Sequence, residues 1–294
     1  MINEPFLENK KSIRLKLNGY SGYQVYLKSN SNEEYTVIKK SSEKRTNERL
    51  QKQYEKHTFF YNLDGKPFCV PEIVNSGYEN GLFFYEYKFV EGISLIKKIE
   101  MSNQEEVIKL CDNILKIIYY FKSRKDFYYE KNVSGNLKQY IQEKIDRNTA
   151  ACGIDKDITK ALLKNLDNFE EEGRYLCHGD FTLDNIIVDT YGKIWLIDYL
   201  DIFPHYWLDL SKLFQDIDGN WFEIKHNIKL PKNKLLFIHK YLIKNINKRD
   251  PAYIKYHNFL VAIAFLRILP YARNLNDKTI LINKIKYFIT NTIV

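Results

Sequence analysis

The sequence predicts an α+β fold with two lobes, a small antiparallel β-rich N-lobe over residues 1–90 and a larger, mainly helical C-lobe over residues 91–294. Two observations lead to this prediction. Before residue 90, short apolar segments alternate with polar residues at a period of two and are separated by glycine-containing turns, as in β-hairpins. After Gly92, apolar residues recur at helical spacing instead.

The N-lobe pattern predicts strands joined by tight turns. Alternation of apolar and charged residues indicates the first strand, and Asn18 to Gly22 form the turn that follows it. A charged and then apolar segment, Asn47 to Leu63, has the spacing of a helix. The expected strands are Ile13–Leu17, Tyr23–Leu27, Tyr35–Lys39, Ile73–Val74 and Leu82–Phe89.

The C-lobe pattern predicts helices interrupted by one hairpin. Ser102 followed by Glu105 has the spacing of a capping box at the start of the first helix. Two short apolar strands, Ile186–Val188 and Ile194–Ile197, are joined at Tyr191-Gly192. Further helices are expected over Leu137–Ile145, over Ile158–Phe169 and repeatedly from Asp209 to Val294.

The composition excludes several classes of protein. With 45% hydrophobic and 28% charged residues, the chain has enough apolar side chains for a packed core. Its net charge of +8 comes from scattered lysines, which favours a solvated basic surface over a nucleic-acid interface. Four well-separated cysteines indicate free thiols. The N-terminus lacks an apolar signal core, and the longest apolar run, Phe259–Leu266, is too short to span a bilayer. We therefore expect a cytoplasmic protein with no membrane and no nucleic-acid partner.

The segment His178-Gly179-Asp180 to Asn185 places polar residues on a loop between apolar segments. Thirteen residues after Asn185, Asp198 follows the second strand of the hairpin, which returns the chain toward its start. Two oxygen ligands on neighbouring loop ends suit Mg²⁺, which fills its octahedron with phosphate oxygens and water. Asp180 is then free to orient a hydroxyl and accept its proton, as phosphoryl transfer requires.

These residues resemble the signature of the aminoglycoside phosphotransferase and choline kinase superfamily, whose members have a protein-kinase-like bilobal fold. The resemblance extends from about Ile13 to Lys212 and implies an ATP- and Mg²⁺-dependent small-molecule kinase. It implies that Asp180 is the catalytic residue and that His178 stabilises the catalytic loop through hydrogen bonds. It makes Asn185 and Asp198 the Mg²⁺ ligands. The N-lobe would bind nucleotide, and the C-lobe would carry the catalytic loop, metal site and acceptor site.

The resemblance also implies nucleotide-binding residues in the N-lobe. A turn containing Gly19, Ser21 and Gly22 is similar to the phosphate-binding turn of the small-molecule kinases, although a plain hairpin turn has the same composition. Alternation places Val37 and Lys39 on one face of a strand. Val37 would lie under adenine and the Lys39 ammonium near the α- and β-phosphates, whereas a solvated strand-end lysine is the alternative.

Two further N-lobe features resemble the family. Glu55, with Glu48 as the second choice, is the helix carboxylate expected to hold Lys39. The segment from Tyr85 to Gly92 resembles the hinge, and Tyr87 and Lys88 are expected to offer their backbones to adenine, within a register of about two residues.

Candidate acceptor-side residues lie further along the chain. Asp201, three residues past Asp198, could face the metal or substrate. Asp209 is expected to brace the catalytic loop, with a simple helix N-cap as the alternative. Arg267 and Tyr271, near Pro270 at a helix end, could recognise an anionic or hydroxylated acceptor, although a solvated helix terminus has the same composition.

The identity of the acceptor rests on family analogy, which favours a sugar or sugar-like alcohol of surface-glycan metabolism. Choline, ethanolamine and aminoglycosides are the alternatives, and a non-catalytic nucleotide-binding scaffold is the alternative of another class. A protein kinase is disfavoured because His-Arg-Asp, Asp-Phe-Gly and Ala-Pro-Glu are missing. The choice between ATP and GTP and the oligomeric state stay open.

Overall fold

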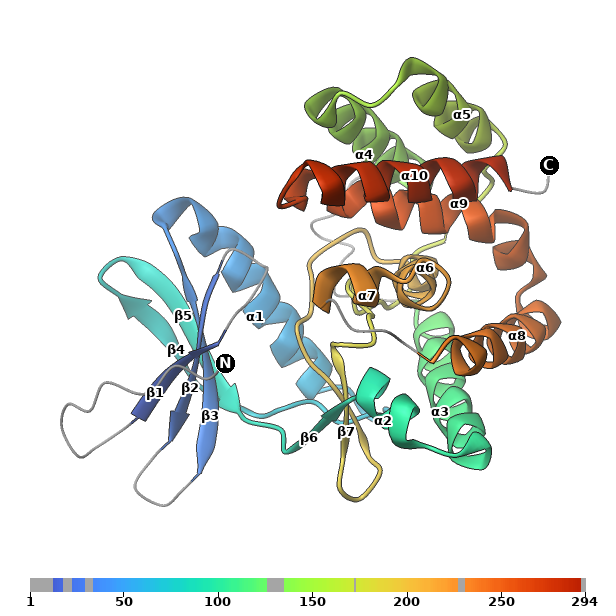
Figure 1. Ribbon diagram of the computed structural model, residues 1–294. Helices are drawn as coiled ribbons and strands as arrows, with labels where there is room; N and C mark the ends of the chain where they lie inside the picture. Colours follow the sequence, from blue (N-terminus) through green and yellow to red (C-terminus); the bar gives the residue numbers. More distant parts are fainter. Residues whose placement is uncertain are drawn as a thin grey trace. The chain divides into compact units, whose positions relative to one another are not determined.

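A computed structural model describes residues 13–17, 23–29, 34–125, 135–171, 173–226 and 231–291, and the chain forms two compact units (Figure 1). The first unit comprises Met1–Ile93 together with Ile186–Asp201, and the second comprises Ser94–Asn185 and Ile202–Val294. The sequence-based division at residue 90 differs from this one in placing the segment 186–201 in the C-lobe. The predicted α+β class, with an antiparallel sheet near the N-terminus and helices beyond it, is confirmed.

The first unit is built on a five-stranded antiparallel sheet with the strand order β1-β2-β3-β5-β4. Residues Val25 and Lys39 are partners across β2 and β3, and Lys39 and Tyr85 are partners across β3 and β5. The strands are β1 (Ile13–Leu17), β2 (Tyr23–Ser29), β3 (Tyr35–Ser41), β4 (Ile73–Glu79) and β5 (Leu82–Lys88), and the short helix η1 (Lys44–Thr46) and the helix α1 (Asn47–Tyr61) follow β3.

One face of this sheet is covered by α1. Leu50 from the helix packs with Tyr23, Val37, Phe83 and Tyr85 from the strands in one buried cluster. Lys39 alternates onto this same face and is 2% exposed, whereas Lys40 lies on the opposite face and pairs with Glu79. The prediction that Lys39 and Lys40 point to opposite faces is therefore confirmed, and the alternative of a solvated strand-end Lys39 is wrong.

The hairpin of β7 (Ile186–Asp189) and β8 (Ile194–Leu196) belongs to the first unit because its backbone is bonded there. Cys69 donates its N–H to Ile194 O at 2.7 Å and accepts from Leu196 N–H at 3.0 Å. On its other side β7 pairs with β6 (Gly92–Ser94). A Cβ atom at Gly92 would lie 2.6 Å from Val188 O, so this close approach of strands requires glycine.

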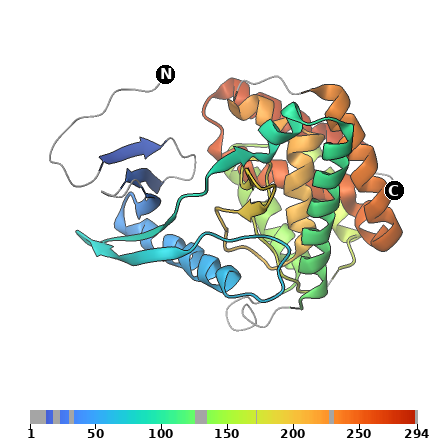
Figure 2. The same cartoon turned by 90° about the horizontal axis from the view of Figure 1, so that it is seen from below.

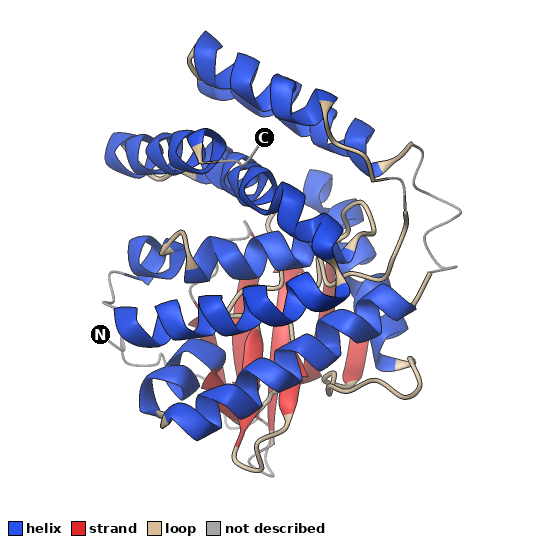
Figure 3. Ribbon diagram, turned by 90° about the vertical axis from the view of Figure 1, so that its right-hand side faces the viewer, coloured by secondary structure: helices blue, strands red, loops and turns tan. Residues whose placement is uncertain are grey.

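The second unit consists of helices, shown in blue in Figure 3. Its long helix α3 packs along α6 and α8 (Figure 2). The helices are α2 (Leu95–Met101), α3 (Gln104–Ser123), α4 (Leu137–Cys152), α5 (Lys156–Asp167), α6 (Tyr206–Ile217), α7 (Trp221–His226), α8 (Lys232–Arg249), α9 (Pro251–Ile268), η3 (Leu269–Tyr271) and α10 (Leu275–Thr290).

The core of the second unit is organised around α6 and α9. Every residue of α6 is buried, and α9 packs against α4, α6, α8 and α10. In the described residues one segment, Pro251–Tyr271, is long and apolar enough to cross a membrane, but 67% of its apolar 18-residue window is buried inside the fold. A central core helix has this composition.

The start of α3 lies one residue later than the sequence indicated. Asn103, not Ser102, is the N-cap, and its side chain accepts from the N–H of Glu106 while Glu106 accepts from the N–H of Asn103. The capping box is therefore present with Asn103 and Glu106 as its members. Ser102 and Glu105 have the same spacing, so the sequence alone did not separate the two registers.

A carboxylate with two histidines links three helices of the second unit. Asp218, at the end of α6, bonds His239 of α8 at 2.7 Å and His257 of α9 at 3.3 Å. Burial alone would raise the pKa of Asp218, but the histidine contacts hold it below its ordinary value, and the bond to Asp218 raises the pKa of His239.

We expect Asp218→Asn to destabilise the protein by about 1–2 kcal/mol near pH 5.5. Because the pKa of His239 is raised on folding, its contribution is complete below pH 6.5 and is lost as the pH rises through the folded value. Because the pKa of Asp218 is lowered, its contribution is lost only as the pH falls below 3.8. Urea unfolding at pH 5.5 and 9 tests this, and an equal loss at both pH values would contradict it.

Candidate active site

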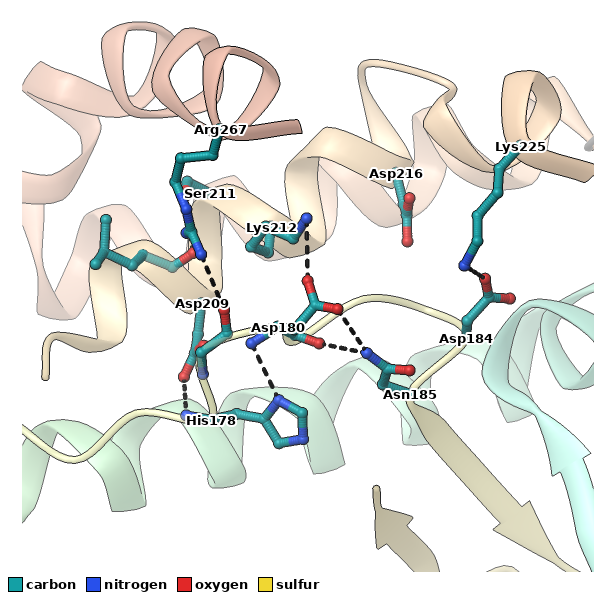
Figure 4. Close-up of polar contacts among 12 residues, drawn as sticks. His178, Asp180, Asp184, Asn185, Asp209, Ser211, Lys212, Asp216, Lys225 and Arg267 are labelled. Atoms are coloured by element: carbon teal, nitrogen blue, oxygen red, sulfur yellow. Dashed lines mark hydrogen bonds and ion pairs between the residues drawn. The ribbon is translucent and has the colours of Figure 1, made fainter. Parts of the chain in front are cut away.

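The loop from His178 to Asn185 is held by α6 of the second unit (Figure 4). The N–H groups of His178 and Gly179 donate to the two carboxylate oxygens of Asp209, at 2.6 and 2.7 Å. Asp209 is fully buried and lies inside α6, whose N-cap is His205. The expectation that Asp209 braces this loop is confirmed, and the alternative that it caps the helix is excluded.

Glycine is needed at the second position of this loop. Gly179 has a φ of 95°, in the left-handed region where a side chain is strained. The turn is closed by a bond from Thr182 N–H to Asp180 O at 2.8 Å and by one from Asn185 N–H to Thr182 O at 3.1 Å. The backbone therefore fixes where the side chains of Asp180 and Asn185 begin.

The carboxylate of Asp180 is held between two side chains. Lys212 Nζ lies 3.0 Å from Oδ1, and the side-chain amide of Asn185 donates to Oδ2 at 3.0 Å (Figure 4). Burial alone would raise the pKa of Asp180, but Lys212, with smaller contributions from Arg267 and His178, lowers it below the ordinary value. Asp180 is therefore an ionised, oriented carboxylate at neutral pH.

His178 is hydrogen-bonded to the backbone of Asp180. Its ring is fully buried, and its Nδ1 accepts the backbone N–H of Asp180 at 3.2 Å. This bond assigns the ring proton to Nε2 in the neutral tautomer. The geometry matches the bracing role expected from the sequence.

Three charged side chains of α6 face the catalytic loop at helical spacing. They are Asp209, Lys212 and Asp216, at positions i, i+3 and i+7 of one helix face. Asp216 accepts the N–H of Leu183 at 2.8 Å, and burial raises its pKa to about 7. Lys212 and Asp216 were not predicted as site residues, although their spacing from Asp209 was a signal in the sequence.

We expect Asp209→Ala to cost about 3 kcal/mol of stability, because it leaves two buried N–H groups without their charged acceptor. It should also lower kcat about 100-fold, since the loop carrying Asp180 loses its anchor. Thermal unfolding and steady-state kinetics measure the two effects. Loss of stability with unchanged kcat would show that the anchor is structural only.

In the first unit, the buried ammonium of Lys39 pairs with Asp198 at 2.6 Å. Burial alone would lower the pKa of Lys39, but Asp198, Tyr85 and Tyr87 raise it above its ordinary value. Asp198 has a φ of 63°, a left-handed conformation that Asp and Asn adopt more readily than other side chains. Such strain is typical of functional residues.

His57 of α1 completes the surroundings of this pair. Its ring packs against Tyr85, Tyr87 and Tyr199, and its Nε2 bonds Pro71 O at 2.7 Å. Burial, assisted by Lys39, lowers the pKa of His57 to about 4, so the ring is neutral. His57 was not identified from the sequence because a lone histidine on a helix has no diagnostic spacing.

The family of the chain follows from a comparison with models of known protein families. The model of the phosphotransferase enzyme family matches residues 13–202, which include Lys39, the whole catalytic loop and Asp198. The chain belongs to this family. The predicted superfamily and the predicted enzyme class, a phosphotransferase of the small-molecule kinase type, are therefore confirmed. No curated protein matches the chain in sequence.

Solved phosphotransferases share the fold. The GDP and kanamycin complex of APH(2'')-IIIa is 14% identical with a TM-score of 0.68, covering 98% of this chain and 95% of that one. The gentamicin complex of APH(2'')-IIa is 15% identical (TM-score 0.66; 96% and 92% covered). The amicoumacin kinase hAmiN with AMP-PNP, Ca²⁺ and Ami is 13% identical (TM-score 0.60; 95% and 88% covered).

Two predictions about the first unit of the phosphotransferase need correction. Glu55 is exposed and does not pair with Lys39, because the inward face of α1 carries Gln53, Lys56, His57 and Phe60. The alternative, Glu48, is also exposed and pairs with Lys52.

The hinge register also needs correction. Lys88 is the last residue of β5, and its N–H already donates to Glu72 O at 2.9 Å, while that of Phe89 donates to Tyr35 O. Tyr87 lies inside β5 with its side chain buried near Lys39. The N–H groups of Lys88 and Phe89 are therefore already bonded within the first unit and are not free to bind adenine.

The other predicted site residues differ from one another in their exposure and in whether they contact the catalytic loop. Gly19, Ser21 and Gly22 lie outside the described residues. Val37 is buried on the face of Lys39, and Asp201 is exposed. Arg267 reaches the catalytic loop through a 3.3 Å bond from Nη2 to Gly179 O, whereas Tyr271 is 63% exposed on η3.

The predicted metal ligands lie at the ends of the β7–β8 hairpin. Asn185 precedes β7 directly and is assigned to the second unit, while Asp198 follows β8 by two residues in the first. The amide nitrogen of Asn185 is bonded to Asp180, so the amide oxygen faces away from that carboxylate (Figure 4). An amide oxygen and a carboxylate oxygen are each ligand types that Mg²⁺ accepts in proteins.

Proposed function

We propose that this phosphotransferase moves the γ-phosphate of ATP to a hydroxyl group of a small molecule. The observation that carries the proposal is Asp180, an ionised carboxylate held by Lys212 and Asn185 on a loop anchored by Asp209. A carboxylate fixed in this way can accept the hydrogen bond of a hydroxyl group and orient its oxygen for in-line attack.

In the proposed reaction, a bond forms between the acceptor oxygen and the γ-phosphorus as the bond to the β,γ-bridging oxygen breaks. The hydroxyl proton passes to Asp180 and then to solvent, and the nucleoside diphosphate leaves. Because Lys212 lowers the pKa of Asp180, this residue is a weak base, and we infer that it acts mainly by orienting the hydroxyl. A loose transition state places little demand on the strength of the base.

Lys39 is proposed to bind the nucleotide phosphates. It is a buried cation on the sheet face that also carries Val37, and its present partner Asp198 is the residue to which we assign the metal. Relatives of similar fold hold GDP or AMP-PNP, which supports nucleotide use and makes GTP a necessary second donor to test.

Asn185 and Asp198 are proposed to hold Mg²⁺ through oxygen atoms. The antiparallel register of β7 and β8, with Ile186 opposite Leu196, supports this pairing because the two ligands flank the same end of the hairpin. When bound, the metal would neutralise phosphate charge during transfer. Asp201 is a further acidic candidate near Asp198 in sequence.

For the acceptor we propose a sugar or sugar-like alcohol, as found in surface glycans. Choline, ethanolamine and aminoglycosides remain alternatives, and the solved relatives include complexes with kanamycin and gentamicin. A non-catalytic scaffold is less well supported, because Lys39, Asp180, Asn185 and Asp198 are all present. A cytoplasmic location is part of the proposal and agrees with four free cysteines.

A mass-spectrometric screen tests the proposed function. The full chain is incubated with Mg²⁺ and either ATP or GTP in the presence of sugars, sugar alcohols, choline, ethanolamine and aminoglycosides. We expect one class of hydroxyl compound to gain the mass of a phosphoryl group, with Asp180→Asn as the inactive control. Binding of nucleotide without phosphorylation of any acceptor would favour the scaffold instead.

A further inference from the structure

Three cationic side chains lie near one another in the second unit, and one of them contacts the catalytic loop. Lys144 and Arg147 come from α4, and Arg267 comes from the last turn of α9. None of the three forms an ion pair with a carboxylate in the part of the chain that the structure describes. We refer to Lys144, Arg147 and Arg267 as the basic cluster.

Arg267 joins this cluster to the catalytic loop. Its side chain points from α9 toward the loop (Figure 4), where Nη2 donates to Gly179 O, the carbonyl next to Asp180. Its Nη1 is buried and has no hydrogen-bond partner among the described residues. A buried guanidinium nitrogen without an acceptor costs free energy, so an acceptor from a ligand would be favourable once a shift of the Arg267 side chain opened access to Nη1.

The other two cations are held next to Arg267 by a contact between α4 and α9. Asn148, 1% exposed, donates to Leu266 O at 3.0 Å, one residue before Arg267. Arg147 Nε donates to the same Asn148 at 3.2 Å. One turn earlier, the Lys144 ammonium lies 4.6 Å from the centre of the Tyr140 ring.

The electrostatics of the cluster are unfavourable without a ligand. Burial, with repulsion from Arg147 and Arg267, lowers the pKa of Lys144 to about 8, and Glu143 opposes this only in part. The Asp180 carboxylate, whose pKa Arg267 helps to lower, already pairs with Lys212. An anion at this position would accept from Arg267 Nη1 and relieve the repulsion among the three cations.

We propose that the acceptor carries an anionic group, a carboxylate or a phosphate ester, which binds the basic cluster while its hydroxyl reaches Asp180. This inference rests on the proposed function and narrows its substrate class to acidic hydroxyl compounds such as acidic or phosphorylated sugars. A polycationic aminoglycoside would bring like charges together here and is disfavoured.

The experiment separates the charge of the acceptor from the activity itself. A cell extract of small molecules is split by anion exchange at pH 8 into retained and unretained fractions. Each is incubated with the enzyme and MgATP or MgGTP, and phosphorylated products are identified by mass. Matched pairs, galactose with galacturonic acid and glucose with glucose 6-phosphate, are tested in parallel and distinguish a carboxylate from a phosphate.

We expect the phosphorylated compound in the retained fraction. Arg267→Met and Lys144→Glu should each raise its KM at least about 10-fold, equivalent to 1.4 kcal/mol, while the KM of the nucleotide changes less than about 2-fold. Arg267→Lys should recover part of the loss. Lys164→Glu, the same charge change at an exposed position of α5, is the matched control and should behave as the wild type.

Two outcomes would overturn the inference. An acceptor found in the unretained fraction would show that the substrate is neutral or cationic, while the proposed function would stand. A rise in the nucleotide KM of Arg267→Met, with the acceptor KM unchanged, would assign the cluster to the nucleotide. If no fraction is phosphorylated by the wild-type enzyme, the proposed function itself fails.

Discussion

Replacing Asp180 with Asn is expected to lower kcat by about 10³-fold, within the range of about 10²–10⁴ found for a positioned acid or base. Asn retains the shape of the carboxyl group and can still bond Lys212, so the loop should keep its conformation. It loses the negative charge that orients the hydroxyl and takes its proton. The measurement is steady-state phosphorylation of the acceptor at saturating nucleotide and Mg²⁺.

The matched control for this variant is Asp184→Asn. Asp184 lies on the same loop and pairs with Lys225 at 2.7 Å, so the substitution makes the same charge change four residues away. We expect its kcat to stay within about 10-fold of the wild type, because Asp184 is not assigned a role in orienting the acceptor. Similar losses in both variants would show that loop charge matters and that Asp180 has no special role.

Replacing Asp198 with Asn is expected to weaken binding of the Mg²⁺–nucleotide complex and to lower kcat/KM by about 10³-fold. Asn tolerates the φ of 63° at this position, so the backbone is not the cause of the loss. The substitution removes the charge that faces Lys39 and that we assign to the metal. Isothermal titration with a non-hydrolysable nucleotide, with and without Mg²⁺, measures the effect.

The same variant makes a second prediction about stability. Lys39 is 2% exposed, and loss of its partner leaves a buried cation uncompensated, at a cost of about 3 kcal/mol or more. Adding Lys39→Met should restore much of the stability without restoring activity, because the charge is removed along with its partner. A double variant as unstable as Asp198→Asn alone would contradict the assignment of this ion pair.

How far the sequence could predict the fold depended on the strength of each local pattern. The period of two in Tyr35–Lys39 was enough to predict that Val37 and Lys39 share one face and that Lys40 lies on the other, but it did not show that Lys39 is buried. The grouping of the hairpin 186–201 with the first unit depends on backbone bonds to Cys69, more than 110 residues away. No local pattern encodes such a contact, so the sequence could not show it.

The site was predictable where one segment carries it. His178, Asp180 and Asn185 lie on one loop of eight residues, and in the structure His178 and Asn185 both contact Asp180. Residues supplied by other elements were harder to predict. Glu55 lies on the exposed face of α1. Lys39 instead pairs with Asp198, and the position of Asp198 beside Lys39 depends on tertiary packing.

Lys212 and the basic cluster also could not be assigned to the site from the sequence. Lys212 is 32 residues from Asp180, and Arg267 is 88 residues from Gly179. Their relation to the catalytic loop comes from the packing of α6 and α9 in the core of the second unit. The chain has 45 basic residues, and no sequence pattern distinguishes the lysines and arginines that lie at the site from the others.

The central claim is that Asp180 acts on the acceptor while Asp198 binds the nucleotide through Mg²⁺. Equilibrium titration of Mg²⁺–AMP-PNP into Asp180→Asn and Asp198→Asn, side by side with the wild type, tests it most directly. We predict that Asp180→Asn binds within about 3-fold of the wild type and that Asp198→Asn loses at least about 100-fold in affinity, or 2.7 kcal/mol. Equal affinities in the two variants would contradict this division of roles.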